Sequence, residues 1–288
     1  MVLFLCAWVL FSNVDSVLGK HSGMKGLNLS TFNFGKAFAA ILFPIVLCVI
    51  GGFTWHLPTL LFALGYGLLL SVSNYSGLGA LKSGNIGIVS TLGSFAMVIP
   101  CVYGLVFLKE SISVCGIIGL VLIVVSIITL NLKSGNGKGK MTKKFWFYMI
   151  LLLLSGGFCS LLQKAHQVAY PGFYQSEFLL YSSLIVLFVF AVINVVGSKK
   201  SGNGIGVSVI KDKAMIFGLI AGVCNCVANY FIMLLAAMEN ATTLYPVQSV
   251  LSVMSSCLVG YVIFKEKLTI KQWVSVVLGV TAAVLMNF

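Results

Sequence analysis

Long apolar runs divided by short polar breaks constrain the fold of this chain more than any other feature. An α-helix rises 1.5 Å per residue, so about 20 apolar residues cross the ~30 Å hydrocarbon core of a bilayer. Such runs cover residues 2–19, 34–51, 57–78, 84–107, 113–132, 145–165, 173–196, 213–237, 241–264 and 270–287. The sequence therefore predicts an all-α integral membrane protein with ten transmembrane helices.

Charge and composition exclude a water-soluble protein. Only 8% of the residues are charged and the mean hydropathy is +1.08, whereas soluble domains carry about 25% charged residues. The net charge of +12 comes from lysines in short connectors, which orient membrane helices and face anionic headgroups; we expect no nucleic-acid binding. All lysines except Lys109 and Lys164 fall in alternate connectors. By the positive-inside rule this predicts cytoplasmic Lys-rich connectors and both termini outside. We expect a multi-pass protein of a bacterial cell membrane.

Residues that would support enzyme or cofactor chemistry are sparse. The three histidines and six acids are scattered, and no phosphate-binding glycine motif is present. The eight cysteines lie mostly in apolar runs and never as C-x-x-C, so we expect small buried apolar side chains rather than disulfides or metal ligands. We therefore expect no enzyme activity, no cofactor and no metal.

One motif occurs twice. "VFLKESISV" begins at Val106 and "VIFKEKLTI" at Val262, and aligning them also matches Ala80 with Ala236 and Gly104 with Gly260. The chain thus divides into a first repeat (1–132), a Lys/Gly linker (133–144) and a second repeat (145–288). Because five helices form each repeat, the second enters the membrane from the opposite side. Inverted-topology repeats are an architecture of secondary transporters.

The repeated motif also has a local structural meaning. Its members are Lys109, Glu110 and Ser113 in the first copy and Lys265, Glu266 and Thr269 in the second. The Lys-Glu pairs are typical of the membrane–water boundary. Ser113 and Thr269 are placed to cap the following helices.

The two motif regions, "GLVFLKESISVCGIIGLVLIVVSIITL" and "GYVIFKEKLTIKQWVSVVLGVTAAVLM", resemble the EamA branch of the drug/metabolite transporter superfamily. The resemblance implies that helices 1–4 and 6–9 surround a cavity while helices 5 and 10 pack outside. It implies a permease that moves a small metabolite or organic cation by alternating access, with proton-coupled export as one version. Uptake of a neutral sugar or polyol and a non-transporting membrane scaffold remain open. The expected partners are a small-molecule substrate, protons and lipid, for a monomer or homodimer.

Ionisable groups inside apolar runs are costly in a bilayer, so each is a functional hypothesis. Asp15 could couple transport to protons or cations, or could pair with Lys20 or Lys25 at the end of its helix. Glu177 could be a solvated interfacial residue or an acid at a cavity mouth. His166 could be simply solvated at an interface, or could titrate near neutral pH.

Neutral polar residues within the runs form a second set of candidates. Amides in hydrocarbon must find partners, either across helices or on a ligand. The candidates for a substrate cavity are Asn13, Asn74, Tyr75, Asn225, Asn229, Tyr230, Tyr245 and Gln248. Pro100 and Pro246 predict helix interruptions that serve packing or gating.

Overall fold

The computed structural model describes residues 2–83, 89–90, 93–131, 142–200 and 213–265, together with positions 270, 273, 274, 277, 278, 281 and 285. The helices are α1 (Val2–Met24), α2 (Leu29–Ala40), α3 (Leu42–Gly51), α4 (Leu57–Ser83), the 3₁₀ turn η1 (Phe95–Met97), α6 (Val98–Val106), α7 (Val114–Asn131), α8 (Lys143–Ala169), α9 (Gln175–Lys200), α10 (Lys213–Met238) and α11 (Ala241–Val262). Most of the predicted linker and tenth span lies outside the described residues, as do Glu266 and Thr269.

The described helices form a multi-pass membrane bundle. Seven segments are long and apolar enough to span a bilayer: Leu3–Met24, Leu29–Gly51, Leu57–Lys82, Lys143–Ala169, Gln175–Val196, Lys213–Met238 and Ala241–Val262. They correspond to seven of the ten predicted spans. Phe95–Val106 is a shorter apolar helix. Large apolar side chains such as Ile50, Phe188 and Val114 are exposed, which suits a surface surrounded by lipid tails.

A proline accounts for the break within the second span. Pro44 has no N–H to donate to the carbonyl of Ala40, and α2 ends there. The Ser183 hydroxyl of α9 donates to that carbonyl at 3.5 Å. The break therefore coincides with a contact to a neighbouring helix, which follows the rule that freed backbone groups in membranes find new partners.

The two predicted proline interruptions have different outcomes. Pro100 follows the 3₁₀ turn η1 at the start of α6, so the fourth span is irregular there as predicted. By contrast, α11 runs through Pro246 without a break in its helical assignment, and the prediction of an interruption at this site is wrong. Pro246 lies in the second turn of α11 and removes one hydrogen bond, the one that a backbone N–H there would donate to the Thr242 carbonyl.

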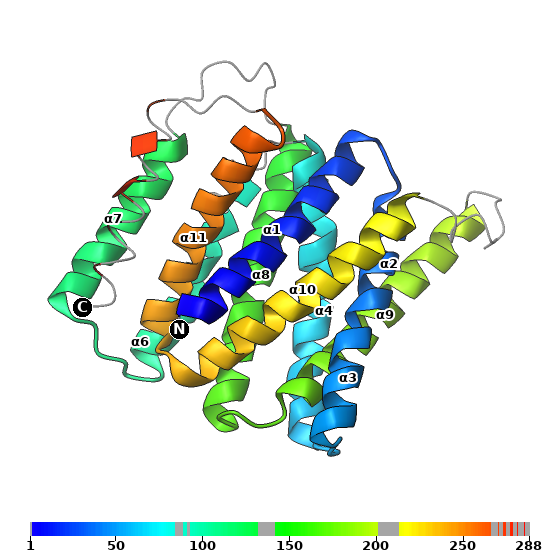
Figure 1. The fold of residues 1–288 in the computed structure, drawn as a ribbon, viewed down its shortest axis with the longest axis horizontal. Helices are drawn as coiled ribbons and strands as arrows, with labels where there is room; N and C mark the ends of the chain where they lie inside the picture. The colour runs from blue at the N-terminus through cyan, green and yellow to red at the C-terminus, as the bar shows by residue number, and fades with distance from the viewer. Residues whose placement is uncertain are drawn as a thin grey trace.

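Helices from the two sequence halves interleave. α10 packs against α1 and α2, and α4 packs against α8 and α9, while α11 contacts α6 and α1. Figure 1 shows α1 beside α10 in the middle of the bundle and α7 at its edge, beside α11. The centre of the bundle is thus built from both halves, and α7 lies outside it.

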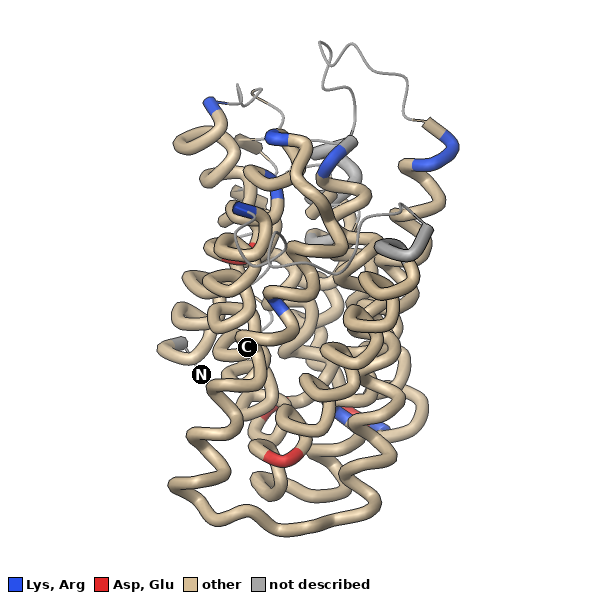
Figure 2. The backbone as a smooth tube through the Cα atoms, turned by 90° about the vertical axis from the view of Figure 1, so that its right-hand side faces the viewer, with Lys and Arg blue, Asp and Glu red and all other residues tan. Residues whose placement is uncertain are grey.

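Charge is distributed unevenly along the bundle. Lysines gather at its upper end in Figure 2, where α1 and α11 end and α8 and α10 begin. We call this the Lys-rich end. Lys109 and Lys164 lie toward the other, Lys-poor end, with Glu110, Glu177 and Glu239.

Candidate functional site

A cavity of about 390 Å³ lies in the centre of the bundle, between the two sequence halves. Its lining comes from α1, α2, α4 and residues 89–97 of the first half, and from α8, α10 and α11 of the second. The polar side chains that line it are Asp15, Ser16, Lys36, Ser73, Asn74, Ser90, Ser94, Ser160, Asn225, Asn229, Tyr245, Gln248, Ser249, Ser252 and Ser256. The lining reaches Gly19, Leu81 and Ser256, so the cavity extends toward the Lys-rich end.

An ion pair forms the charged centre of this cavity. Lys36 Nζ lies 2.7 Å from Asp15 Oδ2, and the two side chains are only 10% and 16% exposed. The partner of Asp15 is therefore Lys36, and the predicted pairing with Lys20 or Lys25 at the end of its helix is corrected accordingly. The reason is the start of the second helix. It begins at Leu29 rather than near residue 34, which places Lys36 two turns inside the helix instead of in a connector.

Amide side chains extend the ion pair into a network across both halves. Lys36 Nζ donates to Asn74 Oδ1 at 3.0 Å, and Asn225 Nδ2 donates to Asp15 Oδ2 at 2.9 Å. Asn229 Nδ2 donates to the Asn225 carbonyl at 2.8 Å and to its Oδ1 at 3.2 Å. The sequence candidates Asp15, Asn74, Asn225 and Asn229 thus share one site, although they lie on three helices.

The far side of the network is closed by α8. Tyr66 OH donates to Asn229 Oδ1 at 2.8 Å, and Gln163 Nε2 donates to Tyr66 OH at 3.1 Å. A second cavity of about 20 Å³ lies beyond the network, bordered by Tyr66, Ser182 and Ser183. Lys36 and the three asparagines line both cavities, so the network forms the wall between them.

Two glycines on α10 set the position of Lys36. A Cβ atom at Gly218 would collide with the Phe32 carbonyl, and one at Gly222 would collide with the Lys36 carbonyl. α2 and α10 therefore approach closely only because both positions are glycine. Gly218 and Gly222 form a G-x-x-x-G pattern, a known signature of close helix packing in membranes. The G-x-x-x-G pattern was the available sequence signal for this close packing against α2. Lys36 itself was not predicted as a cavity residue.

The opposite wall of the cavity is rich in hydroxyl groups. Ser90 Oγ lies 2.9 Å from Ser256 Oγ and 3.4 Å from Ser252 Oγ, joining the first half to α11. Ser249 Oγ donates to the Ser94 carbonyl at 3.3 Å. The Tyr245 hydroxyl donates to the Ser160 carbonyl at 2.8 Å, so Tyr245 both lines the cavity and holds α11 to α8.

Three sequence candidates for the cavity do not line it. Asn13 Nδ2 donates to the Val9 carbonyl of its own helix at 2.7 Å. Tyr75 is 40% exposed and directed against Tyr148. Tyr230 packs edge-on against Phe43. The adjacent Asn-Tyr pairs therefore split, because consecutive helical residues point about 100° apart and only the asparagines face the cavity.

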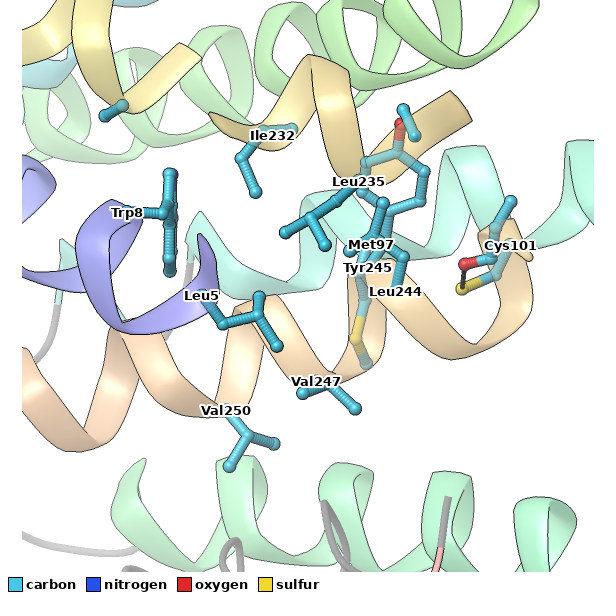
Figure 3. Packing of buried hydrophobic residues seen from close by; sticks show 13 residues of the cluster. Leu5, Trp8, Met97, Cys101, Ile232, Leu235, Leu244, Tyr245, Val247 and Val250 are labelled. Carbon is cyan, nitrogen blue, oxygen red and sulfur yellow. Dashed lines mark hydrogen bonds between the residues drawn. The ribbon is translucent and has the colours of Figure 1, made fainter. Parts of the chain in front are cut away.

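Tightly packed apolar residues close the bundle below the cavity. Leu5, Trp8, Met97, Leu235, Leu244, Tyr245 and Val247 are each at most 8% exposed and belong to one cluster. Figure 3 shows these side chains between α1, α6, α10 and α11, with Cys101 Sγ directed at the Ala241 carbonyl, 3.9 Å away. Trp8 and Met97 also line the cavity, so this cluster forms its floor.

Glu110 joins the two halves at the Lys-poor end. Its carboxylate accepts hydrogen bonds from the backbone N–H groups of Ala241 and Thr242, both at 2.9 Å. Asn240, the N-cap of α11, makes no side-chain cap of its own. Glu110 therefore supplies the missing acceptors for the first turn of α11, where a negative charge is also favoured by the helix dipole.

The backbone around Glu110 is shaped for this contact. Lys109 has a positive φ of 52°, which ends α6 and turns the chain back on itself. A Cβ atom at Gly104 would lie 2.6 Å from Glu110 Oε2, so glycine leaves room for the carboxylate. Ser113 Oγ then accepts from the Gly116 N–H at 2.9 Å, which confirms the predicted cap of the following helix. The repeated motif thus has a tertiary contact in addition to its local role.

Lys164 holds the other side of the same helix connection. Its Nζ donates to the carbonyls of Ala236 at 3.0 Å and Glu239 at 2.5 Å, at the end of α10. A positive charge is favoured there by the helix dipole. Lys164 and Glu110 together fix the connection between α10 and α11 from both of its ends.

His166 is completely buried, so its expected place at a solvated interface is wrong. Its Nε2 lies 3.0 Å from Thr59 Oγ1, and that oxygen lies 2.9 Å from His56 Nδ1. Gln167 Nε2 lies 3.0 Å from His166 Nδ1. The rings of Phe62 on α4 and Phe178 on α9 also pack against His166, a burial that the local sequence "KAHQ" did not reveal.

Glu177 makes a related contact beside this cluster. Its Oε1 accepts from the Thr54 hydroxyl at 3.0 Å and from the Thr54 N–H at 3.2 Å, and Glu177 is 5% exposed. Glu177 is therefore neither a solvated interfacial residue nor an acid lining the cavity. Like Glu110 and His166, it bonds the two halves at the Lys-poor end.

No family model matches the chain, and no curated protein sequence matches it. Among solved structures, 28 chains match. One of them, titled "Crystal structure of protein", aligns over 98% of this chain and 98% of its own with a TM-score of 0.69 and 11% sequence identity. At that identity the likeness shows the fold alone. The fold and its apolar spans define a multi-pass helical membrane protein.

Proposed function

We propose that the chain is a secondary transporter that moves a small polar solute by alternating access. The observation that carries this proposal is the central cavity of about 390 Å³, whose lining comes from both halves and surrounds the Asp15–Lys36 pair. Cavities of this size accommodate small organic ligands. Substrate sites between two repeats near the bilayer midplane are characteristic of such transporters.

An inverted repeat of the EamA type is supported by how the helices pair. If each span is replaced by its counterpart in the other repeat, the α1–α10 contact becomes the α8–α4 contact. The α2–α10 contact becomes the α9–α4 contact in the same way. All four contacts are present. Lys109 and Lys265 share the same φ of 52°. Both observations are expected if the two Lys-Glu motifs occupy equivalent places in the halves 1–132 and 145–288, within a ten-helix protein.

The conformation described is one of the two that alternating access requires. At the Lys-poor end the polar contacts that join the halves include Glu110 to the start of α11, Thr59 to His166, and Thr54 to Glu177. The cavity instead extends toward the Lys-rich end. By the positive-inside rule that end is cytoplasmic, which makes this the inward-facing state. Transport then requires these three contacts to open while the Lys-rich end closes.

The charge state of the cavity favours a small polar metabolite over an organic cation. Lys36 already neutralises Asp15, so a cation would have to displace a covalently attached ammonium group. The second candidate, a neutral sugar or polyol, is favoured by the serine side chains and by Gln248 on the opposite wall. Proton coupling through Asp15 remains compatible with either solute.

Counterflow in proteoliposomes tests the proposal. Vesicles holding the purified full chain are preloaded with one unlabelled solute from each class: amino acids, polyols, sugars and quaternary ammonium compounds. We expect uptake of the matching labelled solute without ATP, and its loss in Lys36→Gln. A folded protein that exchanges no solute of any class would contradict transport and favour the scaffold alternative.

A further inference from the structure

We propose, resting on the transport function above, that the Asp15–Lys36 pair recognises a small zwitterion carrying an ammonium and a carboxylate on one short frame. An α-amino acid is the simplest member of this class. The carboxylate binds at Lys36 and Asn74, and the ammonium binds at Asp15. The three side chains form one corner of the central cavity.

The first argument is charge balance. Asp15 and Lys36 sum to zero charge, and among the described residues no other acidic or basic side chain lines the cavity. A singly charged solute would leave a net charge in a site surrounded by hydrocarbon, which is unfavourable. A zwitterion aligned antiparallel to the pair brings opposite charges to both partners and leaves the total at zero.

The second argument is the unused hydrogen-bonding capacity. Lys36 has three N–H donors, and its bonds to Asp15 and Asn74 use two of them. Both bonds to the Asp15 carboxylate reach Oδ2, so within the described chain Oδ1 has no partner. The Asn74 side-chain nitrogen likewise has no partner in that part of the chain. One corner thus offers two donors for a carboxylate beside one acceptor for an ammonium group.

The third argument is the position of the pair in the transport path. Lys36 and Asn74 come from the first half, and Asn225, which holds Asp15, comes from the second. A solute bound to this corner contacts Asp15, Lys36 and Asn74 of the first half and is linked to the second half through the Asn225–Asp15 hydrogen bond, so its binding energy can bias the relative positions of the halves. The serine wall across the cavity leaves room for different short side chains without adding charge.

A binding series on the purified full chain tests the inference. Thermal shifts with the standard α-amino acids identify the one that binds best, since a ligand of the native state raises the melting temperature. That amino acid is then compared with its N-acetyl derivative, its methyl ester and its N-acetyl amide. We expect each blocked derivative to bind about tenfold to a hundredfold more weakly, because each loses a charge-assisted hydrogen bond.

Two substitutions separate recognition from a purely structural ion pair. We expect Asp15→Asn to lose the free amino acid and to prefer the N-acetyl anion, and Lys36→Gln to prefer the methyl ester cation. Glu239→Gln and Lys213→Gln remove the same charges outside the cavity and should keep the parent preference. Equal loss of all four compounds in folded Asp15→Asn and Lys36→Gln would overturn the inference.

Asn74→Ala keeps the test decisive if a charge substitution does not fold, as judged by size-exclusion chromatography. Asn74 is assigned to the carboxylate alone, so its loss should weaken binding of the amino acid and its N-acetyl derivative and spare the methyl ester. Weakening of all three would contradict the assignment. Absence of a thermal shift with every amino acid for the folded parent would also overturn it.

Counterflow with the same compounds separates this inference from the proposed function. Binding of the amino acid without exchange would leave recognition intact and contradict transport. Exchange of a polyol or a quaternary ammonium compound, with no amino acid binding, would support transport and overturn zwitterion recognition. Exchange confined to the amino acid supports both.

Discussion

The cavity corner and the Lys-poor end use similar side chains in opposite ways. At the Lys-poor end, each oxygen of the Glu110 carboxylate accepts a backbone N–H, and both ring nitrogens of His166 have neighbours at hydrogen-bond distance. In the cavity, Asp15 keeps one oxygen without a partner in the described chain. Fully used polar groups rigidify a structure, whereas spare capacity inside a cavity is available to a ligand. The difference distinguishes two kinds of site. The contacts of Glu110, His166 and Glu177 close the Lys-poor end and are called the seal, whereas the cavity corner is a recognition site.

The largest effect is expected where the cavity corner depends on helix packing. Gly222→Leu would force α10 away from the Lys36 carbonyl, and we expect a loss of about 3 kcal/mol or more in unfolding free energy, at the upper end for overpacking. Gly51→Leu is the control, since a Cβ at Gly51 meets nothing within 4 Å. Size-exclusion profiles and melting temperatures give the readout. Normal folding of Gly222→Leu would show that this crossing does not fix Lys36.

Removing the carboxylate of the seal should have the next largest effect. Glu110→Ala leaves the Ala241 and Thr242 N–H groups without their acceptor, at a cost of about 1–2 kcal/mol. Hydrogen exchange of those amides should accelerate roughly 5- to 30-fold. Lys109→Asn is the matched control, because Lys109 is exposed and asparagine tolerates its positive φ. Unchanged exchange in Glu110→Ala would remove Glu110 from the seal.

A smaller effect is expected from the hydroxyl between the two histidines. Thr59→Val keeps the shape but removes the oxygen that lies near His56 and His166, at about 1 kcal/mol. Thr54→Val should cost less, within roughly 0.5 kcal/mol, because its backbone N–H still donates to Glu177. Melting temperatures measure both. The reverse order would indicate that Glu177, rather than His166, dominates the seal.

The smallest effects are expected at the tyrosines that do not line the cavity. Tyr75→Phe and Tyr230→Phe should leave solute binding within roughly 0.5 kcal/mol of the parent. Asn74→Ala and Asn229→Ala alter the cavity network, so they should weaken binding clearly. Binding isotherms for the same solute decide between them. Weakened binding in Tyr75→Phe would mean that the solute path reaches beyond the cavity described.

Much of the cavity was predictable, because it depends on which polar residues lie inside apolar runs. Asp15, Asn74, Asn225, Asn229, Tyr245 and Gln248 were identified in this way, and all line the cavity. Lys36 was missed because hydropathy sets a helix boundary only to within a few residues. Because of that error, Lys36 was assigned to a connector although it lines the cavity.

The sequence by itself determined the class of protein, seven of the predicted membrane spans, the irregular fourth span at Pro100 and the Ser113 cap, because hydropathy and capping act within a few residues. Only the tertiary structure decided the pairing of Asp15 with Lys36, the capping of α11 by Glu110 and the burial of His166. These contacts join residues far apart along the chain. Their geometry depends on close helix crossings, such as the one at Gly222, and no local periodicity records which helices cross.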